Sequence, residues 1–259
     1  MMKESLWVLG KNIFIGKKSG RFLVEIDGVK SEIAALKLRT IIVSGRVEAT
    51  SRALELAFRN DVSIILLEDK LLWLYKSFPE KDVSLLLNLY KYSREIVEEL
   101  SKAAEFNRKE VSRKFTRGVD IGKAILSTKK CSLEDLLRLS LFLDKFLVGE
   151  SLDFLLKTGL TPITSNNIFL PKLIAEVFKP IALQVFLLKK TSSRMNLEDF
   201  GVLKWILADF KKHLKETVIS DLEGYSKNII EHMEVCVKSL AMFLRNPVAR
   251  EFKAFRIGV

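Results

Sequence analysis

Short apolar runs alternate with turn residues over the first 78 residues, a pattern that predicts a β-rich domain. Asp27-Gly28 is typical of a tight hairpin turn. Residues 62–67 are apolar apart from Ser63, which is typical of a strand covered on both faces and favours parallel pairing. The predicted strands cover residues 5–9, 12–15, 22–26, 40–43, 62–67 and 72–76.

One helix is predicted between the strands of residues 40–43 and 62–67. Thr50 or Ser51 can cap its start, because a hydroxyl accepts a hydrogen bond from the first helical turn. Asn60-Asp61 ends it. A strand, a helix and a second strand in this order predict a crossover unit between parallel strands.

From residue 82 onward, apolar residues recur at helical spacing almost to the C-terminus. One helix is expected to begin at Pro171 and to end before Pro180, since proline cannot donate the helical hydrogen bond. The predicted fold class is therefore α+β. A β-rich domain of residues 1–78, with short strands and one strand–helix–strand unit, precedes an all-α domain of residues 82–259. The predicted helices cover residues 83–100, 133–156, 171–179, 181–190, 197–215 and 222–244.

The charge of the chain is strongly positive and unevenly distributed. The 259 residues carry a formal net charge of +11, of which residues 1–80 hold only +3. The helical part therefore carries +8 and most of the positive field. Such a balance favours nucleic acid, an anionic membrane surface or an acidic partner, although a solvated lysine-rich surface is the alternative.

Residues 108–130 form the densest basic segment and can line a track of phosphates. A solvated helix face explains the same pattern equally well. A second basic cluster surrounds Phe252 and Phe255, where either nucleic-acid contacts or anchoring of the segment by the two rings is expected. The predicted DNA-binding residues are Arg108, Arg113, Lys114, Arg117, Lys123, Lys172 and Lys179.

The two histidines and two cysteines offer little chemistry. Asp209, His213 and Glu216 share one helix face, but nearby lysines favour an exposed, ion-paired face over a metal site. His232 has no acidic or thiol neighbours at an established ligand spacing. Two cysteines, Cys131 and Cys236, are too few for a disulfide framework and are expected to be buried thiols in a reducing compartment.

No apolar run is long enough to span a bilayer, and residues 1–12 do not resemble a secretory signal. The sequence therefore predicts a cytoplasmic protein without a membrane anchor.

Several motifs in order resemble the CRISPR-associated integrase-nuclease family, Cas1, which is the universal spacer-acquisition protein. Residues 39–78 resemble its N-terminal signature of strand, glycine, Ala-Leu helix and apolar strand. "GLTP" (159–162) resembles its Gly-Leu-Asp-Pro, and "AEVFKP" (175–180) resembles its Glu-x-Phe-Arg-Pro. "FTRG" (115–118), "CSLEDLLRLSLFL" (131–143) and "EFKAFR" (251–256) resemble further elements, so the resemblance spans nearly the whole chain.

The resemblance also implies a site for Mg²⁺ or Mn²⁺, held in the family by a His, an Asp and an earlier Glu. Glu176 matches the Glu of Glu-x-Phe-Arg-Pro, which places Leu173 at the position of the metal-binding Asp. No histidine lies between Pro162 and Glu176, and Glu105 is the candidate for the earlier Glu. The outline of a metal site is present, but its ligands are largely lost.

The resemblance implies a homodimer through the β-rich domain, binding of double-stranded DNA, and the small ferredoxin-like Cas2 protein as a partner. The leading hypothesis is a protein of CRISPR spacer acquisition that binds DNA while its metal chemistry is impaired or absent. One alternative is an active nuclease-integrase that uses Glu105, Asp120 or Glu176 as non-standard ligands. The other is a protein-interaction scaffold with no DNA role.

Overall fold

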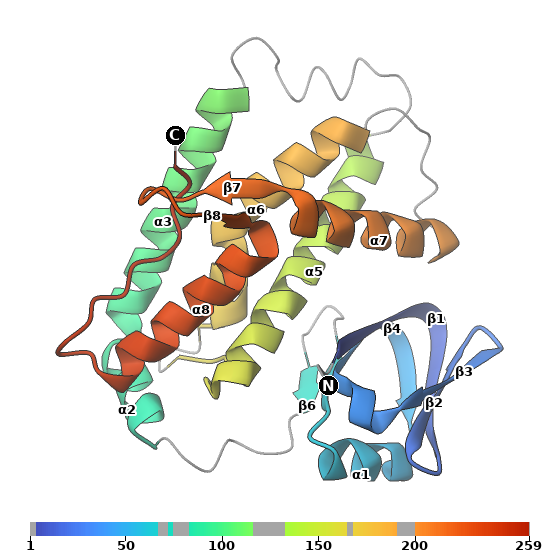
Figure 1. Ribbon diagram of the computed structural model, residues 1–259. Coiled ribbons are helices and arrows are strands. Elements are labelled where there is room, and N and C mark those ends of the chain that lie inside the picture. The colour runs from blue at the N-terminus through green and yellow to red at the C-terminus, as the bar shows by residue number, and fades with distance from the viewer. Residues whose placement is uncertain are drawn as a thin grey trace. The chain divides into compact units, whose positions relative to one another are not determined.

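The chain forms two compact units, Met1–Lys81 and Asp82–Val259 (Figure 1). The computed structural model describes residues 4–66, 72–74, 83–115, 133–164, 168–190 and 200–258. Strands dominate the first unit and helices the second, which confirms the predicted α+β class. Within these described ranges, the helices are all too short or too polar to cross a lipid bilayer.

A six-stranded mixed sheet in the order β3-β2-β1-β4-β5-β6 forms the first unit. β4 pairs in parallel with both β1 and β5, as the crossover unit predicts for β4 and β5. The Asp27-Gly28 turn joins β2 to β3, and both residues have positive φ (49° and 86°) as a tight hairpin requires. The strands are β1 (Glu4–Lys18), β2 (Arg21–Ile26), β3 (Val29–Ala34), β4 (Leu38–Ala49), β5 (Ser63–Leu66) and β6 (Leu72–Leu74).

β1 is one long strand, where the sequence predicts two short ones. Its pairing with β4 shifts after Leu9, so that Gly10 and Lys11 lie opposite the single residue Gly45. Gly45 has φ +128°, and a Cβ atom there would lie 1.9 Å from the carbonyl oxygen of Gly10. Glycine therefore lets the two backbones approach closely, and β1 bends at a bulge without ending.

The helix α1 (Ser51–Arg59) connects β4 to β5 and lies against the sheet (Figure 1). Thr50 caps it, since its Oγ1 accepts a hydrogen bond of 3.1 Å from the N–H of Ala53. The helix buries Leu56 in the same core as Phe22 and Ile41. The local signals for this crossover were therefore sufficient to predict it.

The second unit is a bundle in which α3 packs against α6, and α5 packs against both α6 and α8. Phe210 lies at its centre, with its ring 5.6 Å from that of Phe146 and 5.0 Å from that of Phe186. All three rings are buried, which makes this cluster a core of the bundle. The helices are α2 (Val83–Lys91), α3 (Ser93–Phe115), α5 (Leu133–Thr158), α6 (Leu170–Lys190), α7 (Phe200–Glu216) and α8 (Ile229–Arg245).

The prediction that a helix ends before Pro180 is wrong, because α6 continues through Pro180 to Lys190. Ile181, Ala182 and Phe186 are buried beyond the proline, on the continuation of the same helix. Burial of these side chains offsets the loss of one backbone hydrogen bond at Pro180, which costs about 3 kcal/mol.

The expected helix over residues 222–244 begins only at Ile229, so the second unit is not entirely helical. A small hairpin, β7 (Val218–Ser220) and β8 (Ser226–Asn228), precedes it. Asn228 then caps α8 in a capping box with Glu231. The C-terminal segment adds to the free edge of β7, where Gly258 N–H donates to the Ser220 carbonyl at 2.8 Å.

Candidate functional site

The loop between α5 and α6 is closed by its own hydrogen bonds. Gly159 (φ +79°) ends α5, and the N–H of Leu160 donates to the Leu155 carbonyl at 3.1 Å. Thr164 is buried, and its Oγ1 accepts from the N–H of Ile168 at 3.2 Å. Thr164, the first residue of the polar sequence that follows Pro162 and Ile163, therefore has a structural role. The other residues of that sequence, 165–167, lie outside the described residues.

On α6, the candidate metal-site positions Leu173 and Glu176 are both half-buried. The Glu176 carboxylate lies 3.5 Å from the ammonium group of Lys179. The same ammonium group lies 3.2 Å from Oδ1 of Asp144, on α5. Lys179, which the sequence assigned to DNA, is thus an internal counter-ion between two carboxylates, and only 30% of its side chain is exposed.

Glu105, the third candidate ligand, lies on the exposed side of α3. Its carboxylate pairs with Lys109 at 2.6 Å, and this hydrogen bond lowers the pKa of Glu105. Two carboxylates that already pair with lysines, together with a leucine, do not fit Mg²⁺ or Mn²⁺, which need several oxygen ligands. In the part of the chain that the structure describes, no three His, Cys, Asp or Glu side chains gather as a metal site would require. Asp120 lies outside that part.

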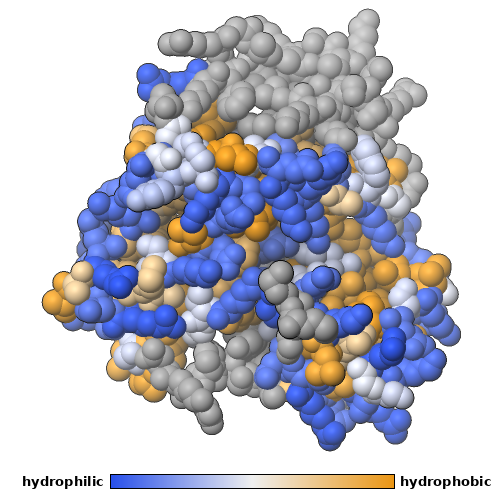
Figure 2. All heavy atoms as spheres, in the orientation of Figure 1, coloured by the Kyte–Doolittle hydropathy of each residue, from blue (hydrophilic) through white to orange (hydrophobic). Residues whose placement is uncertain are grey.

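The basic side chains predicted to contact phosphates on α3 and α6 differ in their exposure and in their ion pairing. Arg108 and Lys172 are exposed. Arg113 is exposed but shares its charge with the almost fully buried Glu110, 2.9 Å away. Figure 2 shows mainly hydrophilic side chains along the edge of the molecule over α3. The side chain of Lys114 lies outside the described residues, as do Arg117 and Lys123.

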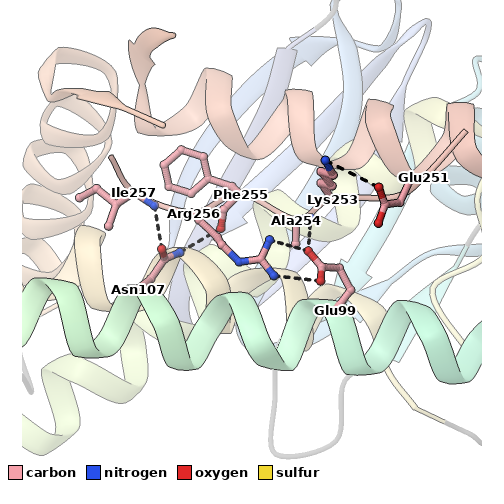
Figure 3. Close-up of polar contacts among 8 residues, drawn as sticks. All are labelled: Glu99, Asn107, Glu251, Lys253, Ala254, Phe255, Arg256 and Ile257. Carbon is pink, nitrogen blue, oxygen red and sulfur yellow. Dashed lines mark hydrogen bonds and ion pairs between the residues drawn. The ribbon is translucent and has the colours of Figure 1, made fainter. Parts of the chain in front are cut away.

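The C-terminal segment of residues 251–258 runs along α3 in extended form (Figure 3). Both ends of the Arg256 guanidinium group bind the carboxylate of Glu99, with N–O distances of 2.8 and 2.9 Å. The same carboxylate accepts the backbone N–H of Ala254 at 2.9 Å. Arg256 is therefore engaged within the protein, and the anchored alternative for this cluster is confirmed by burial of Phe252 and Phe255.

Asn107 joins three parts of the second unit through one fully buried side chain (Figure 3). Its Nδ2 donates to the carbonyl of Val177 on α6 at 2.9 Å and to that of Phe255 at 3.1 Å. Its Oδ1 accepts from the N–H of Ile257 at 2.8 Å. The amide thus satisfies backbone groups that burial would otherwise leave without partners.

Sequence reasoning missed both Glu99 and Asn107. A signal for Asn107 was present, because a polar residue there interrupts the apolar stripe of α3. A buried amide needs hydrogen-bond partners, so its position predicts a polar contact inside the bundle. Glu99 carries no such signal, since a glutamate on a helix is usually solvated. The apolar stripe of α3 that Asn107 interrupts consists of Ile96, Leu100, Ala103 and Val111.

The expected exposed, ion-paired face around His213 is wrong, because His213 is buried. Its ring lies 5.6 Å from the ring of Phe186, and its Nδ1 lies 3.0 Å from Oγ1 of Thr217. The aromatic core accounts for this burial, which local sequence could not show. Glu216 on the same helix is exposed and lies 3.8 Å from Lys212.

Cys236 is buried, as expected, and burial raises the pKa of its thiol to about 11. A thiol with this pKa is almost wholly protonated at neutral pH and has little nucleophilic character. Cys131 lies outside the described residues. The described part of the chain therefore offers no activated cysteine for catalysis.

Burial lowers the pKa of His232, whose Nε2 lies 2.9 Å from the carbonyl oxygen of Ile219. That hydrogen bond and the charges of Asp221 and Glu231 act in the opposite direction but are outweighed, and Lys227 adds to the lowering. The unfolded chain therefore takes up this proton at a higher pH than the folded protein. His232 stabilises the fold above its ordinary pKa of about 6.5, and this contribution is lost as the pH falls below that value.

We expect the melting temperature to fall between pH 7.5 and 5.5, and to fall less in the variant His232→Gln. Glutamine retains an N–H donor for the Ile219 carbonyl but does not titrate in this range. Thermal melts of both proteins across this pH interval test the prediction. Equal pH dependence in the two proteins would show that another group causes it.

Several solved structures have a fold similar to that of this chain. A Cas1 protein from Thermotoga maritima has a TM-score of 0.67 at 15% identity, covering 94% of this chain and 97% of that chain. A casposase bound to an integration product has a TM-score of 0.71 at 14% identity, with 96% and 92% covered. The TtCas1–DNA complex has a TM-score of 0.57 at 11% identity, with 96% and 95% covered. Among curated protein sequences, none matches the chain.

These structures define the class, an α+β protein with the fold shared by Cas1 proteins and the casposase. At such low identities, the likeness shows the fold alone. The model of the family described as CRISPR associated protein Cas1 matches residues 6–138, which is more than half of the sequence. The chain belongs to the Cas1 family.

Proposed function

We propose that the chain is a DNA-binding protein of CRISPR spacer acquisition whose metal-dependent chemistry is impaired or lost. Its membership of the Cas1 family supports a role in acquisition. One observation carries the catalytic part of the proposal. Leu173 stands where the family resemblance places a metal-binding Asp, while Lys179 neutralises the adjacent Glu176.

The binding of double-stranded DNA is supported by the charge of the chain and by its structural relatives. One such relative is a Cas1 protein in complex with DNA, and another is a casposase bound to an integration product. The helical part of this chain carries +8 of the total +11. Arg108 and Lys172 offer exposed cations for phosphate groups, whose contacts release counterions and strengthen binding.

We expect the purified protein to bind duplex DNA but to show no appreciable cleavage or strand transfer at millimolar Mg²⁺ or Mn²⁺. Two carboxylates that already pair with lysines hold such an ion only weakly, because the ion gives up its waters reluctantly and needs several oxygen ligands. The variant Leu173→Asp alone is not expected to restore activity, since the histidine is still missing and Glu176 is still paired. A gel assay of binding and cleavage on the same labelled duplex measures both properties.

The alternatives give different results in this assay. Mn²⁺-dependent cleavage that disappears in the variant Glu105→Ala would establish an active enzyme with non-standard ligands. The matched variant Glu95→Ala removes a carboxylate from the same helix and controls for nonspecific loss. Absence of DNA binding at low salt would instead favour a protein-interaction scaffold.

We also propose that two copies associate through the β-rich unit. The sheet ends in the short strands β3 and β6, and an edge strand leaves backbone N–H and C=O groups available for pairing. Sedimentation is expected to show a dimer at micromolar concentration, and the same run after dilution of the sample serves as the control. A monomer at every concentration would contradict the proposal.

Cas2 is the partner that the family suggests for such a dimer. The Cas6-RT-Cas1–Cas2 complex contains a chain with a TM-score of 0.57 to this one at 9% identity, and 36% of that chain is covered. We propose that the chain assembles with a Cas2-type protein on DNA.

A further inference from the structure

A cavity in the second unit lies between α8, the turn of the β7–β8 hairpin and the C-terminal segment. Its volume of about 350 Å³ is within the usual range of sites for small ligands. α8 lines it with four side chains at positions i, i+3, i+4 and i+7, which share one face of the helix. These four residues are His232, Val235, Cys236 and Ser239. The cavity takes no part in the function proposed above.

His232 supplies a hydrogen-bond acceptor to this cavity. Its side chain is only 2% exposed, and its Nε2 lies 2.9 Å from the carbonyl oxygen of Ile219. A carbonyl oxygen only accepts, so Nε2 carries the proton of the neutral ring and Nδ1 keeps a lone pair. Among the described residues, no group donates a hydrogen bond to Nδ1. A buried polar atom requires a partner, so an N–H donor inside the cavity would complete the hydrogen bonding of this ring.

The basic side chains that line the cavity are already paired with carboxylates (Figure 3). The ammonium group of Lys253 lies 3.6 Å from the carboxylate of Glu251. The Arg256 guanidinium group is held at both ends by Glu99. Glu223 also lines the cavity, and none of the described cations pairs with its carboxylate. The two ion pairs cancel, so the charge of Glu223 is left without a counter-ion.

Asp221 adds a second negative charge at the hairpin turn. Its Oδ1 accepts two backbone N–H groups of this turn, each at 2.9 Å, which fix the carboxylate and leave its charge in place. Within the described part of the chain, Asp221 forms no ion pair, and its charge acts on His232. Lys227 and Glu231 also act on His232, and their charges cancel each other. The cavity is therefore net negative, although the chain as a whole is positive.

We propose that this cavity binds an alkylammonium group, which either a free polyamine or a lysine side chain of a partner supplies. An ammonium group has three N–H donors and no acceptor, which matches the lone pair of His232 and two carboxylates without counter-ions. The same groups repel an anion. Val235 and Phe255 provide apolar walls for the alkyl stem of the ligand. This inference does not depend on DNA binding or on the state of the metal site.

Nuclear magnetic resonance of the full chain with ¹⁵N-labelled histidine tests the proposal, because the chain has only two histidines. The probes are n-butylammonium chloride and its neutral counterpart n-butanol, since the amine is fully charged at neutral pH. We expect the butylammonium ion to shift the Nδ1 signal of His232 saturably and to leave His213 unchanged. Its affinity is expected to exceed that of n-butanol at least about tenfold. The variant His232→Gln assigns the two sets of signals.

The double variant Asp221→Asn/Glu223→Gln is expected to weaken the binding of butylammonium about tenfold. It removes both charges, while asparagine keeps the oxygen that accepts the N–H groups of the turn. The matched variant Glu95→Gln/Glu98→Gln removes two charges from exposed positions on α3, which do not line the cavity. This control should bind butylammonium as the unchanged protein does.

Two further probes, spermidine and Nα-acetyl-lysine amide, distinguish the sources of the ammonium group. The ligand whose affinity falls more in the double variant Asp221→Asn/Glu223→Gln identifies the source as a free polyamine or a lysine side chain. Equal affinity for butylammonium and n-butanol would overturn the proposal, and so would unchanged affinity in this double variant. Binding that leaves the Nδ1 signal of His232 in place would also overturn it, because the cation would then lie elsewhere on the surface.

Discussion

The triple variant Arg108→Ala/Arg113→Ala/Lys114→Ala is expected to bind duplex DNA about 100-fold more weakly at about 0.1 M salt. If all three side chains contact phosphates, their loss also reduces the slope of log K against log salt by about two to three. Arg113 contributes the least, because Glu110 already shares its charge at 2.9 Å. The loss should be similar for all duplex sequences, since phosphate contacts position DNA without reading its bases. Titrations at several salt concentrations measure affinity and slope together.

A matched variant separates local contacts from the general loss of charge. Lys204→Ala/Lys212→Ala/Lys238→Ala removes the same charge from exposed positions on α7 and α8. This variant should keep the original slope and lose little affinity. If both triple variants lose affinity equally, the DNA does not contact α3 specifically. If the α3 variant keeps the slope of the unchanged protein, these residues serve only to solvate the helix.

The variant Asn107→Leu is expected to lower the free energy of unfolding by about 3–5 kcal/mol. Leucine branches at the same carbon as asparagine and is larger, so the expected loss does not come from a cavity. It comes from the Val177 and Phe255 carbonyls and the Ile257 N–H, which lose their partner inside the protein. Each buried backbone group without a partner costs about 1–3 kcal/mol. Urea denaturation followed by circular dichroism measures the change.

The same substitution at Asn88 provides the control. The Asn88 side chain donates one hydrogen bond, to the Leu244 carbonyl, and is only part-buried. The variant Asn88→Leu should therefore cost only about 1 kcal/mol. Equal losses in the two variants would show that α3 tolerates leucine at 107 and that water or another group satisfies the C-terminal segment. A loss confined to Asn107→Leu would identify this amide as the main link between α3, α6 and the C-terminal segment.

Local chemistry was enough to predict several parts of the molecule. The Asp27-Gly28 hairpin, the Thr50 cap and the parallel pairing of β4 with β5 all depend on residues close in sequence. Turn residues set backbone angles, caps bind the adjacent helical turn, and an apolar strand requires cover on both faces. These signals act without knowledge of the rest of the chain.

Long-range packing explains the predictions that failed. Pro180 lies inside α6 because buried side chains on both sides of it keep the helix together. His213 packs against Phe186, which belongs to α6 and not to its own helix α7. The spacing of lysines around His213 describes its own helix and contains no information about the surface that this helix faces.

By itself, the sequence determined the class of the fold, the crossover unit, the excess of positive charge and the absence of a histidine between Pro162 and Glu176. Only the tertiary structure decided which charged groups are engaged within the protein. Lys179 lies between Asp144 and Glu176, and Arg256 binds Glu99. The partners Lys179 and Asp144 are far apart in the sequence, and so are Arg256 and Glu99. An ion pair depends on a distance of a few ångströms in space. Residue types and their spacing along the chain do not determine that distance for groups on different elements.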